Sequence, residues 1–165
     1  MSVIKVRGMK ISLAKVKQRM VHFEEVCRNS GMKLTHQRIE IFREVAQTGD
    51  HPDAEMVYQG VRKRMPTVSL DTVYRTLWLL KDLGLITVLG SAREKTRFDA
   101  NLSPHHHFVC MRCGIMQDLF CKEFDKIKPP KSIKALGQPE TTNVEVRGIC
   151  LECGQREKKS RKTEI

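Results

Sequence analysis

The spacing of apolar residues in the first third of the chain predicts two helices. Apolar side chains recur at helical intervals between Val21 and Cys27. A second helix is expected to begin after Thr35, whose hydroxyl suits an N-cap. The inward face of this second helix consists of Ile39, Ile41, Phe42 and Val45. The basic stretch before Val21 shows no comparable pattern, so we expect no core element there.

Two further helices are expected before the pattern changes. Asp53 can cap the first of them, and Pro66 ends its run of helically spaced apolar positions. Ser69 can cap the second, which continues to about Leu83, where Gly84 suits a C-terminal cap. A succession of three such helices is typical of a helix-turn-helix domain.

Short strands are predicted after these helices. Residues 85–89 and 96–98 predict an antiparallel hairpin, the wing that often completes a helix-turn-helix domain. Residues 107–109 and 115–120 predict a second hairpin around a Cys-x-x-Cys turn, and residues 143–149 alternate as a further strand. The expected fold class is α+β, with an N-terminal winged-helix domain followed by a small α/β domain.

The net charge of the chain indicates which class of binding partner to expect. Lysine and arginine number 30 against 19 acidic residues, which gives a net charge of +11 and favours a polyanion such as nucleic acid. No apolar run approaches the roughly 20 residues of a membrane helix, and the N-terminal residues do not resemble a signal peptide. We therefore expect a cytoplasmic protein with no membrane partner.

Four of the six cysteines form two closely spaced pairs, Cys110 with Cys113 and Cys150 with Cys153. Four thiolates at this spacing are typical of a closed tetrahedral zinc site, which holds a fold together and leaves no position for a substrate. A redox-active pair or unpaired thiols are the alternative. Two cysteines remain without an assigned role, Cys27 and Cys121.

Nitrogen and oxygen donors surround the first cysteine pair in sequence. On a strand, His105 and His107 share one face and could hold one ion, while His106 points the other way. Further donors occur at His51, Asp99 and Asp118. Imidazole and carboxylate donors suit Fe²⁺, Mn²⁺ or Zn²⁺, and donor type alone does not select among these ions. Histidines solvated in a loop are the alternative to a metal site.

The expected helix after Ser69 is the candidate recognition helix. Its expected outward positions offer hydroxyls, a ring and a guanidinium fork that suit base edges in the major groove, at Thr72, Tyr74, Arg75 and Thr76. Tyr74 could instead pack beneath the helix, and Trp78 suits packing better than base contact. Phosphate contacts or merely solvated charges are expected at Lys33, Arg38, Arg62, Lys63 and Arg64.

The motifs follow one another in an order that resembles the ferric uptake regulator (Fur) family. The resemblance covers residues 21–155 and rests on HPDAEMVY, PTVSLDTVYRTLWLLKDLGLI, RFD, HHHFVCMRCG and CLECG. It implies a homodimeric, metal-dependent repressor that binds an inverted-repeat operator in double-stranded DNA and is not an enzyme. It also implies a dimerisation domain with a structural Zn²⁺ and a regulatory Fe²⁺ or Mn²⁺ at the domain junction.

The peroxide-sensing (PerR) branch of the family is the most similar. Its regulatory ligands are three histidines and two aspartates, which fall here on His51, Asp99, His105, His107 and Asp118. Iron-responsive members usually carry a glutamate slightly nearer to the histidines than the aspartate that follows Phe98. The resemblance implies that His51 and His105 are sensitive to oxidation. An iron-responsive ferric uptake regulator is the alternative.

One position departs from many relatives, which use a histidine eight positions before the third zinc cysteine in a further metal site. Here that position is Thr142, although Asp125 could match the acidic ligand of the same site. Without the histidine we expect no third metal site, and His106 has no assigned partner.

The motifs and the charge together divide the chain into five expected segments. These are a basic N-terminal arm (1–20), a winged-helix DNA-binding domain (21–99), a linker (100–104), a zinc-containing dimerisation domain (105–157) and a charged tail (158–165).

We expect metal binding to stabilise the domain orientation that fits the operator, and so to control peroxide-defence or metal-homeostasis genes. Two other classes of protein compete with this interpretation. A metalloenzyme is disfavoured because the thiolate site is closed and no catalytic spacing such as HExxH occurs. A metal-independent architectural DNA binder would leave the spare histidines and aspartates unexplained.

Overall fold

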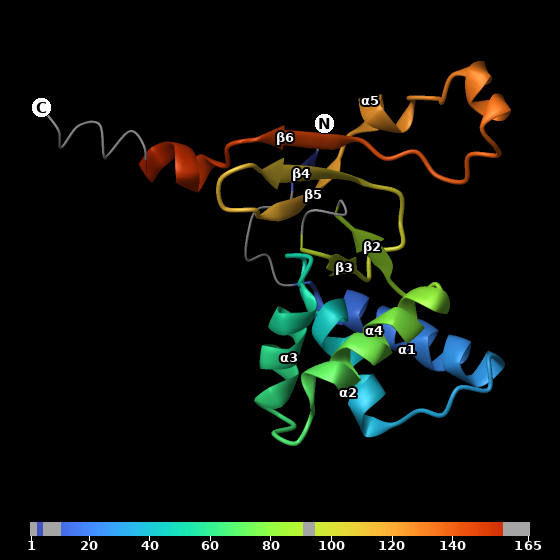
Figure 1. The fold of residues 1–165 in the computed structure, drawn as a ribbon, viewed down its shortest axis with the longest axis vertical. Helices are drawn as coiled ribbons and strands as arrows, with labels where there is room; N and C mark the ends of the chain where they lie inside the picture. Colours follow the sequence, from blue (N-terminus) through green and yellow to red (C-terminus); the bar gives the residue numbers. More distant parts are fainter. Residues whose placement is uncertain (1–2, 5–10, 91–94, 157–165) are drawn as a thin grey trace, which may run out of the picture. The chain divides into compact units, whose positions relative to one another are not determined.

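The computed structural model describes residues 3–4, 11–90 and 95–156 (Figure 1). The chain divides into two compact units, one formed by Gly8–Ser103 and the other by Pro104–Ile165 together with Met1–Arg7. The expected charged tail at 158–165 lies outside the described residues.

Helices dominate the unit formed by Gly8–Ser103. Its elements are α1 (Leu13–Asn29), α2 (His36–Ala46), α3 (Ala54–Arg62), α4 (Leu70–Asp82), and the antiparallel strands β2 (Thr87–Leu89) and β3 (Arg97–Asp99). Thr35, Asp53 and Ser69 cap their helices as predicted, since each side chain accepts a hydrogen bond from the N–H three residues later. Helices and hairpin together make the winged-helix arrangement (Figure 1).

The hydrophobic core of this helical unit joins all four helices to the hairpin. Phe23 of α1 stacks on Phe42 of α2 at 4.6 Å between ring centroids. The predicted inward face of α4 is fully buried, at Val73, Leu77 and Leu80. Because this face is buried, the opposite face of α4 points to solvent.

Helix α1 begins earlier than the sequence pattern predicts and takes in residues 13–20 of the expected arm. Ser12 caps it by accepting a hydrogen bond from the Lys15 N–H at 3.3 Å. Met20 packs partly buried against the core and extends the apolar stripe by a turn. The sequence pattern does not predict this extension of α1, because basic residues interrupt the apolar positions there.

A four-stranded sheet with the order β1-β5-β4-β6 forms the centre of the other unit. Its strands are β1 (Val3–Ile4), β4 (His106–Cys110), β5 (Met116–Phe120) and β6 (Glu145–Gly148), and two short helices follow β5, α5 (Lys122–Asp125) and η1 (Lys131–Ala135). Strand β4 pairs antiparallel with β5 and parallel with β6. The sequence pattern does not predict β1, because two residues are too short to show an alternation.

An ion-pair network ties α2 to the segment that follows α3. Glu40 is only 4% exposed and binds both Arg43 and Arg64, the latter at 2.6 Å from Arg64 Nε. Arg64 also reaches Glu44 at 2.7 Å. A Cβ atom at position 60 would clash with the Glu44 carboxylate where it now lies, so Gly60 makes room for it. Arg64 therefore holds the turn that leads into α4, although its side chain is 41% exposed.

None of the helices among the described residues is long and apolar enough to cross a membrane.

Replacing Glu40 with glutamine is expected to lower the free energy of unfolding near neutral pH by about 2 kcal/mol, since hydrogen bonds to charged groups contribute about 1.5–3 kcal/mol. Burial opposes the charge, but the Arg64 hydrogen bond and the charges of Arg43 and Arg64 outweigh it and lower the pKa of Glu40. The ionised form therefore stabilises the fold above the ordinary pKa of 4.5, and this contribution is lost as the pH falls through the lower, folded-state pKa.

Urea unfolding of the wild type and the Glu40→Gln variant at several pH values checks this expectation. The difference between the two proteins should shrink as the pH falls below 4.5, the ordinary pKa of this carboxyl. Glu25→Gln, at an exposed position on α1, is the control and should match the wild type throughout. A difference that stayed constant over this range would contradict an ionised Glu40.

Candidate metal centres

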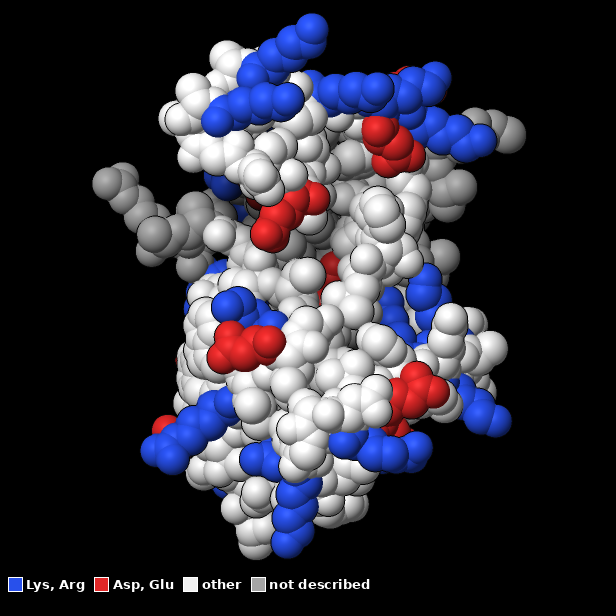
Figure 2. All heavy atoms as spheres, turned by 90° about the vertical axis from the view of Figure 1, so that its right-hand side faces the viewer, with Lys and Arg blue, Asp and Glu red and all other residues white. Residues whose placement is uncertain are grey.

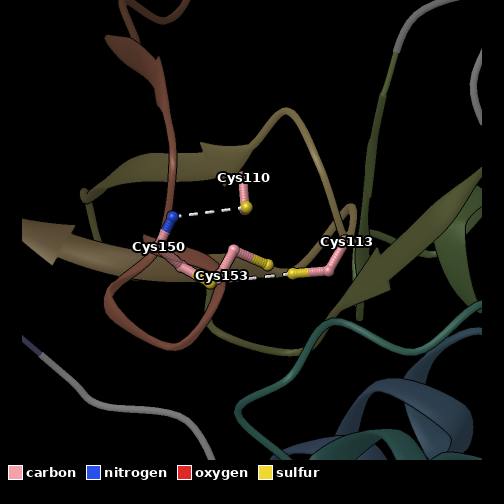
Figure 3. Close-up of side chains that lie close together, drawn as sticks. All are labelled: Cys110, Cys113, Cys150 and Cys153. Carbon is pink, nitrogen blue, oxygen red and sulfur yellow. Dashed lines mark hydrogen bonds between the residues drawn. The ribbon is translucent and has the colours of Figure 1, made fainter. Parts of the chain in front are cut away.

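The four expected zinc ligands lie together in the unit built on the sheet. Cys110 ends β4, Cys113 lies in the turn between β4 and β5, and Cys150 and Cys153 follow β6 (Figure 3). Their sulfur atoms all lie within 4.8 Å of one another. The parallel pairing of Cys110 with Gly148 brings the two Cys-x-x-Cys segments side by side.

The geometry of this sulfur cluster fits a tetrahedral zinc ion. With zinc–sulfur bonds of about 2.3 Å, two ligands of a tetrahedron lie about 3.8 Å apart. The Sγ atoms of Cys113 and Cys150 are 3.8 Å apart. No partner outside the four cysteines is needed, so the cluster is closed and offers no position for a substrate.

Backbone amides stabilise negative charge in the sulfur cluster. Burial opposes ionisation of Cys110, but N–H groups of Cys113, Cys150 and Arg112 outweigh it and lower the pKa of this thiol to about 6. The Cys150 N–H lies 3.3 Å from Cys110 Sγ. Hydrogen bonding to Cys150 and burial raise the pKa of Cys153 to about 12. Without a cation the cluster thus resists complete ionisation, and a divalent ion would supply the missing positive charge.

The five expected regulatory ligands are divided between the two units, and each group forms a compact half-site. In the sheet unit, β4 pairs His107 directly with Asp118 of β5, so both side chains lie on one face. His105 lies two residues before His107 on the same face, and the two rings are 4.6 Å apart. His105 Nε2 lies 3.7 Å from Asp118 Oδ1. All three side chains are buried.

The second half-site lies in the helical unit, where His51 Nε2 faces Asp99 Oδ2 at 3.5 Å. Both residues are buried. His51 has a φ of 48°, the one positive value outside glycine among the described residues, and this conformation disfavours side chains with a Cβ atom. The Arg97 guanidinium donates to the His51 carbonyl at 3.1 Å, and the Phe98 N–H donates to the Pro52 carbonyl at 3.0 Å. Neighbours on β3 therefore hold His51 in place.

The side chains of both half-sites are imidazoles and carboxylates, which commonly bind divalent metal ions. Two donors about 2.1 Å from one ion lie about 3.0–3.6 Å apart when their bonds diverge by 90–120°. The two histidine–aspartate distances of 3.5 and 3.7 Å fall at or just beyond this range and exceed the length of an ordinary hydrogen bond. Imidazole and carboxylate in a buried setting suit Fe²⁺, Mn²⁺ or Zn²⁺. The residues present thus fit a regulatory metal.

His106 points to the other face of the sheet and binds protein groups with both ring nitrogens. Its Nε2 lies 3.1 Å from Asp125 Oδ1, and its Nδ1 accepts from the Val144 N–H at 3.1 Å. Phe124 packs edge-on against the ring at 5.4 Å. His106 therefore joins α5 to the segment before β6 through hydrogen bonds at both ring nitrogens. Sequence reasoning missed this partner because Asp125 and Val144 are far from His106 in the chain.

The expected DNA-binding residues lie in the helical unit, three of them on α4. Tyr74 is 42% exposed, so it does not pack beneath the helix. The expected outward position of Thr76 is wrong, because this residue is only 6% exposed. The Arg75 side chain is 81% exposed and pairs with Asp71 at 2.9 Å. Thr72 lies 2.8 Å from the Ser69 hydroxyl and supports the cap of the helix. Lys33 is exposed in the connection between α1 and α2. On the face drawn in Figure 2, basic side chains project from each unit and acidic ones are interspersed among them.

Comparison with known proteins places this architecture in one family. The sequence profile described as "Ferric uptake regulator family" matches residues 29–147, more than half of the chain. The chain belongs to the ferric uptake regulator family. Members of this family are transcription regulators, so the chain is not an enzyme.

Two curated relatives are named "Peroxide-responsive repressor PerR". The one from Staphylococcus aureus (strain USA300) is 30% identical over 128 residues, which cover 76% of this chain and 85% of the relative. The one from Staphylococcus epidermidis is 29% identical over 126 residues, which cover 76% and 84% of the two proteins.

A solved member of the family shares the fold. The structure of the Helicobacter pylori ferric uptake regulator Fur, described as having three functional metal binding sites, superposes with a TM-score of 0.69. It is 21% identical to this chain and covers 84% of it and 93% of its own length.

Cys113→Ser is expected to lose one tightly bound Zn²⁺ per chain and the protection of the β4–β6 amides against hydrogen exchange. The reason is that a structural zinc site contributes about 10–16 kcal/mol in zinc-finger peptides, so its loss should unfold the sheet unit. Elemental analysis and hydrogen exchange measure the two effects. Cys121→Ser is the matched control outside the cluster, and it should keep both zinc and protection. A Cys113→Ser protein with full zinc content would contradict the assignment.

Asp125→Asn is expected to leave the metal content of the protein unchanged and to destabilise it by about 1 kcal/mol, the typical contribution of one hydrogen bond. The physical reason is that Asp125 binds the ring of His106, which the backbone already occupies on its other nitrogen. Metal analysis after dialysis and thermal unfolding check the two parts. Loss of one metal ion in the variant would reveal a third metal site.

Proposed function

We propose that the protein is a homodimeric, metal-dependent DNA-binding repressor that responds to hydrogen peroxide through an iron-loaded regulatory site. The observation that carries the proposal is the pair of buried histidine–aspartate half-sites, at His51 with Asp99 and at His105 with His107 and Asp118. The similarity to peroxide-responsive repressors, at about 30% identity, supports the same function.

In this proposal the five side chains of the two half-sites bind one Fe²⁺ or Mn²⁺ ion. Because one half-site belongs to each unit, a shared ion would favour a single orientation of the helical unit relative to the sheet unit. Ligand binding of this kind shifts the population toward the orientation that fits the operator. The structural Zn²⁺ of the four cysteines would stay bound in both states, because its closed thiolate cage serves the fold.

Double-stranded DNA is the proposed partner, bound at an inverted repeat by the two α4 helices of a dimer. Thr72, Tyr74 and Arg75 would face base edges, and Lys33 would contact a phosphate.

Support for a dimer comes from the sheet unit, which exposes large apolar side chains at Met111, Ile127, Leu136, Ile149 and Leu151. We propose that the protein acts in the cytoplasm, on peroxide-defence or metal-homeostasis genes.

When bound, Fe²⁺ would supply the redox chemistry by which hydrogen peroxide oxidises a nearby imidazole. In the net reaction one oxygen atom of hydrogen peroxide is added to the ring of His51 or His105, and water is the other product. An oxidised ring loses basicity at nitrogen and binds a metal more weakly. The half-site then releases its ion, and the orientation suited to the operator is no longer favoured.

An iron-responsive regulator is the second candidate, because the same donor set can respond to the concentration of Fe²⁺ alone. The aspartate at position 99 favours peroxide sensing, since it matches the acidic ligand of the peroxide-sensing pattern. The two candidates differ in whether peroxide changes the protein covalently.

Zinc-loaded protein with added Fe²⁺ is expected to lose its affinity for DNA after brief treatment with dilute hydrogen peroxide, whereas the Mn²⁺ form keeps it. The probe is an inverted-repeat duplex selected by this protein from a randomised pool. Mass spectrometry should find one added oxygen atom on the peptides that contain His51 and His105. The peptides of the exposed residues His22 and His36 are internal controls and should stay unmodified.

Two results would contradict parts of this proposal. DNA binding that follows metal but ignores peroxide, with unmodified histidines, would make the protein an iron- or manganese-responsive regulator. DNA affinity independent of any added metal would instead indicate a metal-independent DNA binder.

A further inference from the structure

Trp78, the single tryptophan of the chain, connects the recognition helix α4 to the strand that carries a regulatory ligand. Its ring meets the ring of Phe98 edge-on, with centroids 6.2 Å apart and an interplanar angle of 83°. Such edge-to-face pairs are specific contacts whose energy depends on the relative position of the rings. Trp78 is nevertheless 44% exposed, so burial in the core alone does not account for it.

Phe98 lies between two residues that hold the His51 half-site. Because successive side chains of a strand alternate between its faces, Phe98 points into the core while Arg97 and Asp99 point the other way. Asp99 faces His51 at 3.5 Å, and Arg97 donates to the His51 carbonyl at 3.1 Å. Strand β3 thus carries the metal half-site on one face and the contact with α4 on the other.

An ion in this half-site would restrain β3. The distance of 3.5 Å between His51 Nε2 and Asp99 Oδ2 already suits two ligands of one ion, so Asp99 could bind without a large shift. Two further hydrogen bonds tie β3 to the same loop, from Arg97 to the His51 carbonyl and from the Phe98 N–H to the Pro52 carbonyl. An ion held by His51 and Asp99 would therefore fix the position of β3, and with it the position of Phe98 against Trp78.

We propose that Trp78 is a positioning residue that couples metal capture by His51 and Asp99 to the orientation of α4. The inference rests on the proposed metal-dependent DNA binding and deepens it. A direct base contact is the less favoured role for Trp78, because it lies nine positions after the cap residue Ser69, while the first turns of a recognition helix usually contact bases.

The emission of the single tryptophan tests the coupling directly in the full-length, zinc-loaded protein. Titration with Mn²⁺ should shift the emission of Trp78 in the wild type and leave it unchanged in Asp99→Asn. In Phe98→Leu the shift should disappear while Mn²⁺ still binds, as followed by the electron paramagnetic resonance of free Mn²⁺. Direct quenching by the paramagnetic ion would persist in Phe98→Leu, since the distance from ion to tryptophan is kept. That result would overturn the proposal.

DNA binding provides the second test, with the selected inverted-repeat duplex as the probe. Trp78→Leu should reduce the gain in DNA affinity on adding Mn²⁺ by about tenfold, within the range typical of coupled sites. Its affinity for DNA without Mn²⁺ and its affinity for Mn²⁺ should stay within about twofold of the wild type. Trp78→Phe keeps a ring beside Phe98 and should restore most of the gain. Met56→Ala, at another exposed apolar position of the helical unit, is the control and should behave as the wild type.

The outcomes separate this coupling from the proposed function. Equal weakening of DNA binding with and without Mn²⁺ in Trp78→Leu would make Trp78 a DNA contact and overturn the coupling. Wild-type DNA affinity that ignores Mn²⁺ would overturn the proposed function, and the emission experiment would still decide whether metal in the half-site affects Trp78.

Discussion

The cluster of four cysteines is the interaction on which the sheet unit depends. Among the described residues, every member of the large hydrophobic core belongs to the helical unit. Among the described residues of the sheet unit, the buried apolar side chains are Val109, Cys110 and Met116, beside three buried histidines and one buried aspartate. So small an apolar core cannot offset the conformational entropy lost on folding, and small domains of this kind usually need a metal or disulfides. Four thiolates around one zinc ion supply that missing stabilisation.

The same cluster determines where the regulatory donors lie. It joins the turn between β4 and β5 to the end of β6, and so holds β4 in register with both neighbours. Because the side-chain period of a strand is two, a slip of one residue would exchange the faces of His106 and His107. His107 would then leave Asp118 and lie near Asp125. A metal bound by the cysteines at one end of β4 would therefore preserve the arrangement of donors at the other end.

Local patterns predicted much of the helical unit and of the sulfur cluster. The caps Thr35, Asp53 and Ser69 and the buried face of α4 follow from short-range rules, and the confirmed features depend on residues near one another in sequence. The features that sequence reasoning missed join distant segments. Arg64 lies on the surface as expected, but its ion pair with Glu40, which is far from it in the chain, was not predicted. No spacing rule encodes such a contact, because its geometry exists only after the helices pack.

The thiolate cluster and the histidine–aspartate half-sites differ in the metal affinity that each is suited to provide. Thiolates bind zinc tightly and form a closed tetrahedron, which suits a metal that should remain for the lifetime of the fold. Imidazole and carboxylate bind Fe²⁺ and Mn²⁺ more weakly, since both ions stand low in the general affinity order. A sensing site requires that weakness, because an ion that never dissociates can report neither its own concentration nor damage to a ligand. Three such donors lie on β4, on β5 and just before β4, and two lie on a strained loop and on β3, so each unit carries an incomplete site. If one ion is shared as proposed, neither half alone would offer enough ligands to hold it, and occupancy would require both halves to be intact.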